Sequence, residues 1–125
     1  MGYRPISDYA LIGDMNSAAL VSTDGSIDWC CFPRFDSPSV FAALLDADHG
    51  GSFQIAPIGS IQKQTQWYLP NTNVIRTKFV TDTGILEVTD FMPVASAACR
   101  GTSPHEIHRI VRCIRGTVES RCMFQ

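Results

Sequence analysis

Short stretches of alternating hydrophobic and polar residues, separated by turn-forming residues, run through most of the chain. The alternation is clearest over residues 61–69, 73–81 and 85–92. A period of two residues is typical of strands, because successive side chains point to opposite faces of a sheet. The pattern predicts an all-β fold, mainly antiparallel, which we expect to be a β-sandwich.

Two hairpins are predicted from glycine-containing turns. The first joins residues 17–22 and 27–32 through the Asp-Gly step at residues 24–25, and the second joins residues 73–81 and 85–92. Glycine adopts the positive backbone torsions that tight hairpin turns require. The second strand of the first hairpin is partly apolar on both faces, which predicts a central place in its sheet.

One short helix is expected between Ser37 and Leu45. Ser37 is a good N-cap, and Pro38 suits the first helical position because its missing N–H group has no partner there. Phe41, Leu44 and Leu45 would share one side of this helix. We expect it to cover part of a sheet.

The last two expected strands, residues 106–115 and 117–124, flank Gly116. The pattern of the second strand continues to residue 124 without a turn or a polar tail. Completed domains usually finish with such features, and 125 residues are enough for one hydrophobic core. We therefore expect a single domain over residues 1–125 that is truncated and forms an incomplete sandwich.

The segment 61–69 carries the most polar face of the predicted sheets. Gln64, Gln66 and Tyr68 alternate with Thr65 and Trp67, and we expect the glutamine-rich face to contact solvent. Trp67 and Tyr68 can stack on sugar rings, although large aromatic side chains in sheets more often belong to a core. Both roles stay open for these two residues.

The overall composition restricts the class of partner. The chain is 45% hydrophobic and 18% charged with a net charge of -2, which is ordinary for a globular domain. No run of Lys or Arg offers a basic stripe to nucleic acid. The N-terminal residues lack the pattern of a secretion signal, and no stretch of about 18 apolar residues occurs. We expect no nucleic-acid partner, no membrane association and a cytoplasmic location.

Five cysteines are expected to remain thiols. An odd number of cysteines without a secretion signal favours a reducing compartment. No C-x-x-C pair occurs, so the spacing of a structural zinc site is missing. We expect the thiols to be small core side chains, and we expect adjacent Cys30 and Cys31 to point to opposite faces of a strand.

The acidic residues form no convincing catalytic pair. Glycoside hydrolysis needs two carboxyl groups on either side of one bond, whereas Asp24 fits a turn and Asp28 fits the polar face of a strand. The segment His105-Glu106-Ile107-His108 resembles a metal-binding motif, but residues three apart on a strand face opposite sides. We predict no catalytic residue, no metal and no cofactor in this chain.

The segment Pro33-Arg34-Phe35-Asp36 is the strongest candidate for a binding site. Pro33 and the following Pro38 stiffen a loop that holds a guanidinium and a carboxylate between aromatic residues. The two charged side chains could also bond to each other or cap the next element, which the residues favour equally.

Three stretches carry a resemblance to a known family. They are Ser7–Asp14, Asp24–Phe41 and Asp46–Gly51, and the block from Trp29 to Phe41 is the most specific. Together they resemble the N-terminal domain of bacterial and archaeal glucoamylase-like and trehalase-like proteins of glycoside hydrolase family 15. The similarity extends over nearly the whole chain.

The resemblance implies an accessory β-sandwich that precedes a catalytic (α/α)6 barrel. Family members release glucose from α-glucosides, some from maltooligosaccharides and others from trehalose, with inversion, and their catalytic glutamates lie in the barrel. The resemblance implies that the downstream barrel is a partner, that the parent acts on an α-glucoside or trehalose, and that the loop Pro33–Asp36 shapes the sugar pocket or the domain interface. The phosphate and magnesium dependence of some relatives is not carried over.

Two other functions are consistent with the residues. A free-standing carbohydrate-binding module would use Trp67 and Tyr68, and sugar would then change its tryptophan fluorescence. A small structural protein would assemble, for example as a homodimer, through unpaired sheet edges. A monomer at high concentration would argue against the second alternative.

Overall fold

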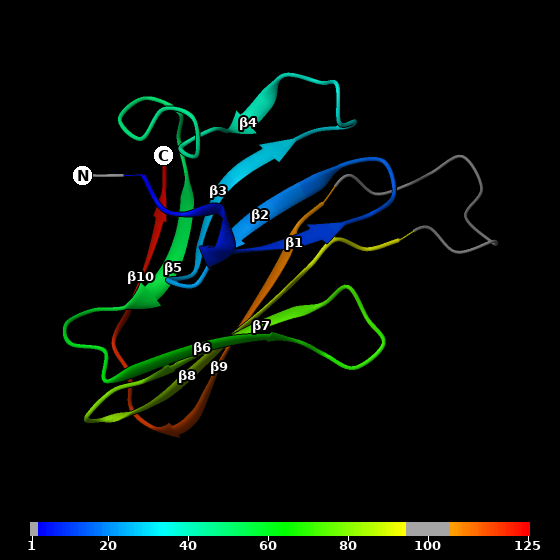
Figure 1. The fold of residues 1–125 in the computed structure, drawn as a ribbon. Coiled ribbons are helices and arrows are strands. Elements are labelled where there is room, and N and C mark those ends of the chain that lie inside the picture. The colour runs from blue at the N-terminus through cyan, green and yellow to red at the C-terminus, as the bar shows by residue number, and fades with distance from the viewer. Residues whose placement is uncertain (1–2, 95–105) are drawn as a thin grey trace.

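The computed structural model describes residues 3–94 and 106–125, which form two antiparallel sheets packed face to face (Figure 1). Sheet A contains β1 (Tyr9–Gly13), β2 (Ala18–Ser22), β3 (Ser26–Cys31), β4 (Ser39–Phe41), β5 (Phe53–Pro57) and β10 (Ser120–Phe124). Sheet B contains β6 (Lys63–Tyr68), β7 (Ile75–Val80), β8 (Gly84–Phe91) and β9 (His108–Gly116). The expected antiparallel β-sandwich is confirmed.

The two predicted hairpins are present and build the centre of each sheet. In sheet A the order is β1-β2-β3-β5-β10, with β4 also paired to β3, and in sheet B it is β6-β7-β8-β9. The turn between β2 and β3 contains Gly25 at a φ of 80°. β3 has neighbours on both sides, so its predicted central place is confirmed.

The prediction of a helix between Ser37 and Leu45 is wrong. Residues 39–41 instead form β4, in which Phe41 lies opposite Cys30 of β3, and turns follow. β5 pairs only with Ser26 and Ile27 of β3, so the far end of β3 has an unpaired edge that β4 covers. This long-range pairing buries Phe41 to 4% exposure and overrides the local helix signal. The one helical element in the described ranges is a 3-10 turn, η1 (Ile6–Asp8).

The core consists of two clusters of buried side chains between the sheets. The larger cluster joins β1, β2 and β3 to Ile75 and Met92, and the smaller one contains Ile55, Phe79, Leu86 and Val88. Phe53 packs against both clusters and connects them.

The glutamine-rich face of β6 contacts solvent only in part: Gln62 and Gln64 are exposed as expected, whereas Gln66 is half-buried. Gln66 lies opposite fully buried Thr77. Its Nε2 donates hydrogen bonds to the Thr77 hydroxyl and to the Ser22 carbonyl of sheet A, both at 3.0 Å. Gln66 therefore links the two sheets, because its amide satisfies polar groups that the packing encloses.

The cysteines fall into two groups. Cys30 and Cys31 are buried, whereas Cys113 and Cys122 are exposed. The expectation of core side chains is therefore wrong for the last two, because they lie on β9 and β10, the final strands of their sheets. Cys99 lies outside the described residues. No helix in the described part is long and apolar enough to cross a membrane.

Candidate functional site

The loop Pro33–Asp36 lies on the surface between β3 and β4. All four of its residues are exposed, and the Phe35 side chain is 57% exposed. The backbone is held in place, since Phe35 N donates to the Asn16 carbonyl at 3.0 Å and Arg34 N donates to the Ser37 hydroxyl at 3.1 Å. Within the described ranges, no hydrogen bond or ion pair holds the charged groups of Arg34 and Asp36. The loop thus presents its side chains outward from a fixed backbone.

The turn that supports this loop contains a buried carboxylate. Asp14 Oδ1 accepts hydrogen bonds from Asn16 N at 2.9 Å and from Ser17 N at 2.8 Å. The Ser17 hydroxyl donates to the Cys31 carbonyl, at the end of β3. These bonds fix the connection between β1 and β2 to the strand that carries the loop, so the two connections form one surface.

The two candidate aromatic residues do not form a shared sugar platform. Trp67 and Tyr68 are neighbours on β6 and therefore point to opposite faces. The Tyr68 hydroxyl accepts from Leu11 N at 2.9 Å and donates to the Leu11 carbonyl at 2.8 Å. Trp67 is 38% exposed on the other face. The Tyr68 hydroxyl is thus engaged with β1, while the Tyr68 side chain is 45% exposed.

A polar hollow of about 420 Å³ lies against sheet A. Its walls come from the N-terminal segment, from β3 and β5, from the residues after β4 and from the end of β10. Its polar lining includes Arg4, Tyr9, Asp24, Ser26, Asp28 and Gln54. None of these residues was singled out as a site residue from the sequence.

The carboxylates of this hollow are held by neighbouring side chains. Asp28 accepts from the Tyr9 hydroxyl at 2.6 Å and from the Ser26 hydroxyl at 2.5 Å. Arg4 forms an ion pair with Asp24. Burial raises the pKa of Tyr9, and its hydrogen bond to Asp28 raises that pKa further. Tyr9 therefore stays a neutral donor, and the arrangement suits hydrogen bonding to polar groups better than proton transfer.

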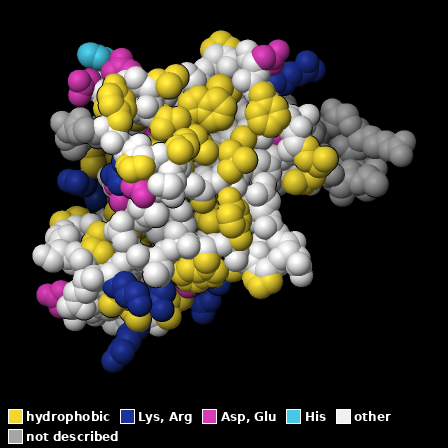
Figure 2. All heavy atoms as spheres, in the orientation of Figure 1, with side chains coloured by type: hydrophobic (Ala, Val, Ile, Leu, Met, Phe, Trp, Pro, Cys, Tyr) yellow, Lys and Arg dark blue, Asp and Glu magenta, His cyan; other side chains and the backbone are white. Residues whose placement is uncertain are grey.

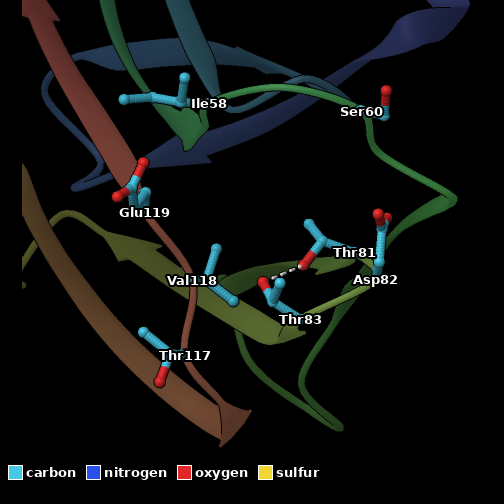
Figure 3. A pocket seen from close by; sticks show the side chains of 8 residues that line it. All are labelled: Ile58, Ser60, Thr81, Asp82, Thr83, Thr117, Val118 and Glu119. Atoms are coloured by element: carbon cyan, nitrogen blue, oxygen red, sulfur yellow. Dashed lines mark hydrogen bonds between the residues drawn. The ribbon is translucent and has the colours of Figure 1, made fainter.

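A second hollow, of about 360 Å³, lies at one end of the sandwich (Figure 3). Three connections meet there, residues 58–60, 81–83 and 117–119, and Figure 3 shows their side chains around the space. The lining is Ile58, Ser60, Thr81, Asp82, Thr83, Thr117, Val118 and Glu119. Hydroxyl groups and two carboxylates make this hollow polar, and no residue singled out from the sequence lies in it.

Histidine and acidic residues do not gather into a metal site. Across residues 3–94 and 106–125, no three His, Cys, Asp or Glu side chains lie close enough together to hold a metal ion. Within the motif-like segment, His108 Nε2 lies 2.7 Å from a Glu106 carboxylate oxygen. His105 lies outside the described residues.

The hollow against sheet A was not predicted from the sequence, because the residues that line it are far apart in the chain. Tyr9 and Asp28 are 19 positions apart, and Gln54 lies on another strand. A partial signal was available: Asp28 is the one charged residue in an otherwise mainly apolar central strand, and a buried carboxylate in such a strand needs hydrogen-bond partners.

Comparison with known proteins gives one consistent result. The profile of the family described as "Trehalase-like, N-terminal" matches residues 2–125. The chain is 38% identical to a trehalase of Mycobacterium tuberculosis over 94% of its own length and 19% of that protein. It is 40% identical to a trehalase of Thermoplasma volcanium over 99% of its length and 20% of that protein.

A third relative extends the comparison to another archaeon. The chain is 44% identical to trehalase 1 of Sulfolobus acidocaldarius over 78% of its length. It spans about a fifth of the length of the curated relatives that it matches. No solved structure matches the chain. Since the family profile covers nearly every residue, the chain belongs to the trehalase-like N-terminal domain family.

Proposed function

We propose that this chain is the non-catalytic N-terminal domain of a family 15 glycoside hydrolase, and that it supports a downstream barrel that releases glucose from trehalose or another α-glucoside with inversion. One observation carries the proposal: residues 2–125 match an N-terminal domain family, and the matched trehalases are about five times longer than this region. The engaged carboxylates of the polar hollow agree with a role that is not catalytic.

The outer face of sheet A offers a surface on which such a barrel can pack. Leu11, Leu20 and Trp29 lie side by side in register on β1, β2 and β3, on the face opposite the core. Figure 2 shows hydrophobic side chains gathered over these strands. The outer face of a two-layer sandwich is usually polar when water covers it, so this apolar row favours a third layer.

The loop Pro33–Asp36 is the part of the domain that we propose for contact with the barrel or its sugar pocket. Arg34 and Asp36 project from a backbone that is fixed by Asn16 and Ser37. A guanidinium and a carboxylate on a rigid support suit directional hydrogen bonds to hydroxyl groups or to a facing polar surface.

The test is an activity assay on the whole polypeptide that the gene encodes. We expect glucose release from trehalose or from a maltooligosaccharide, with the β-anomer of glucose detected first by NMR. Arg34→Ala should raise KM or lower kcat at least several-fold, as loss of a charge-assisted contact does, whereas Arg112→Ala on exposed β9 should change neither constant. Absence of glucose release from every α-glucoside tested would refute the proposal.

The two alternative functions remain testable on the same protein. Trp67 and Tyr68 are both exposed but lie on opposite faces of β6, so they cannot form one sugar platform, which weakens the carbohydrate-binding module. A homodimer would be detected by sedimentation at high concentration. We also propose a cytoplasmic location, which agrees with the free thiols of the four described cysteines and can be tested by cell fractionation.

A further inference from the structure

The polar hollow of about 420 Å³ opens on the outer face of sheet A, away from sheet B. On β5, Gln54 lies opposite Ser26 of β3 and Met123 of β10, and all three residues line the hollow. Their neighbours Ile27 and Ile55 alternate with them and are buried in the core between the sheets. The hollow therefore lies over paired strands, which give it a rigid floor.

Two segments outside the sheet complete the walls of the hollow. Residues 3–4 and the turns after β4 contribute side chains to its lining. The Tyr3 hydroxyl donates to the Leu45 carbonyl at 3.2 Å, so the two segments are joined to each other. Ser26 and Asp28, at the floor between them, are only 7% and 8% exposed. Such a concave, preformed shape is typical of small-molecule sites.

The floor of the hollow offers hydrogen-bond acceptors in fixed positions. The two oxygens of the Asp28 carboxylate accept from the Tyr9 hydroxyl at 2.6 Å and from the Ser26 hydroxyl at 2.5 Å. Each hydroxyl has donated its one hydrogen in these bonds, so its oxygen can offer only lone pairs to a ligand. The carboxylate oxygens also keep acceptor capacity, because each can accept about two hydrogen bonds. A ligand at the floor must therefore donate.

The walls of the hollow supply donors. The Gln54 Nε2 group uses one of its two hydrogens in a bond to the Asp24 carbonyl at 3.2 Å. The Arg4 guanidinium, which pairs with the Asp24 carboxylate, has five N–H groups in a planar fork. Donors on the walls and acceptors at the floor fit a ligand whose groups both donate and accept. Hydroxyl groups have this property.

The charges of the lining favour a neutral ligand. The Arg4 guanidinium and the Asp24 carboxylate compensate each other, and the Asp28 carboxylate is stabilised by two hydroxyl donors. An ammonium group would meet the guanidinium, and an anion would meet Asp28, so either charge encounters a repelling partner. The Tyr3 ring and three apolar side chains provide surfaces for C–H groups, the apolar residues being Ala43, Ala47 and Met123.

We propose that this hollow binds a small, neutral, polyhydroxylated molecule, a sugar of one or two rings. Its volume of about 420 Å³ lies near the lower end of the range of small-molecule sites, which is roughly 300 to 1,000 Å³. Asp28, Ser26 and Gln54 bind the hydroxyl groups, and the apolar wall contacts the ring carbons. The ligand is held without being chemically changed, since the carboxylates are engaged with neighbouring donors.

The test is hydrogen exchange of the full polypeptide with and without a probe sugar, followed by mass spectrometry. The probes are glucose, chosen because of the proposed function, and myo-inositol. At about 100 mM of a bound probe, peptides that cover residues 22–30 and 52–57 should exchange at least about threefold more slowly. A ligand that binds only the closed site reduces local opening by the factor 1 + [L]/Kd. Methylammonium at the same concentration tests a cationic ligand.

Two variants identify the hollow as the place of binding. Ala47→Trp fills the hollow from an exposed wall position, and Gln54→Leu removes a polar group from its floor. Both should lose the protection by sugar. Leu45→Trp places the same bulk on the same segment, at a residue that is 72% exposed and does not line the hollow, so it should retain the protection. Circular dichroism checks that each variant is folded.

Protection by glucose or myo-inositol in the parent protein and in Leu45→Trp, with loss in a folded hollow variant, supports the proposal. No protection by either sugar overturns it, and this outcome requires no variant. Protection by methylammonium alone overturns it as well, because the hollow would then be a cation site, and so does equal protection in a folded Ala47→Trp. Glucose release is assayed separately, so a protein that binds sugar here without releasing glucose would refute the proposed function and leave this inference standing.

Discussion

The guanidinium of Arg109 and the carboxylate of Asp90 form an enclosed ion pair, with Nε 2.7 Å from Oδ1 and the two side chains 3% and 0% exposed. The same guanidinium donates to the carbonyls of Phe53 and Gly25, at 2.7 and 2.6 Å. Arg109 and Asp90 lie in sheet B, whereas Phe53 and the turn at Gly25 belong to sheet A. One side chain therefore joins the two sheets by hydrogen bonds as well as by packing.

Arg109→Met should destabilise the fold by about 3–5 kcal/mol, because it leaves a buried carboxylate without its partner. It also removes the donor for two enclosed backbone carbonyls. Urea unfolding followed by circular dichroism measures the change. Arg112→Met, on the exposed face of the same strand, is the matched control and should stay within about 0.5 kcal/mol of the parent protein.

The pH dependence of the Arg109→Met variant provides a second check. Burial raises the pKa of Asp90, and the Arg109 guanidinium acts against this rise. Without the guanidinium, the folded-state pKa lies still further above the unfolded one. The protonated carboxyl then favours the folded state at low pH, and this contribution is lost as pH rises. The free energy of unfolding of the variant should therefore be closest to that of the parent protein at about pH 4. An equal loss of stability at neutral and acidic pH would contradict this account.

Tyr68→Phe should free the backbone N–H and carbonyl of Leu11 on the edge strand β1 while keeping the aromatic ring. The hydroxyl makes two hydrogen bonds to Leu11, so the expected loss of stability is about 1–3 kcal/mol. Hydrogen exchange of the Leu11 amide should become faster, because its acceptor is gone. Trp67→Phe on the other face of β6 should leave that amide unchanged. Unaltered exchange at Leu11 in Tyr68→Phe would exclude the proposed role of the hydroxyl.

Gly25→Ala should be markedly destabilising. Gly25 has a φ of 80°, and a Cβ there would overlap the carbonyl oxygen of Ile55. Gly59 has a φ of 89° with open space around it, so Gly59→Ala isolates the backbone cost, which is about 1–2 kcal/mol. We expect Gly25→Ala to cost more than Gly59→Ala in thermal unfolding. Equal costs would show that the turn can move away from Ile55.

Stability should fall at alkaline pH through Cys30. Burial raises the pKa of this thiol to about 12, with smaller contributions from Cys31 and Asp14. In the unfolded chain the thiol ionises near its ordinary pKa of about 8.5. The folded protein therefore retains a proton that the unfolded chain loses, and between these two values the free energy of unfolding should decrease by about 1.4 kcal/mol per pH unit.

Cys30→Ala is the control for this alkaline slope. The variant removes the thiol, so its unfolding free energy should fall less steeply over the same pH range, whatever its stability at neutral pH. Denaturant titrations at several pH values measure both slopes. Identical slopes for the two proteins would show that Cys30 ionises in the folded state as it does in the unfolded one.

The candidate site was only partly accessible from the sequence. The loop Pro33–Asp36 was found from its prolines and charges, which are local signals. The polar hollow was not found, because Tyr9, Asp28 and Gln54 come together only through strand pairing.

The sequence by itself determined the antiparallel β class, the two hairpins and the family, because alternation, glycine turns and local motifs depend on neighbouring residues. The tertiary structure decided the conformation of residues 37–45, of which residues 39–41 pair with the end of β3. It also decided the inward direction of Gln66 and the bridge from Arg109 to Gly25, across 84 positions of the chain. Which strands pair and which faces meet depends on contacts between residues that are distant in the chain, and a local sequence pattern does not predict these contacts.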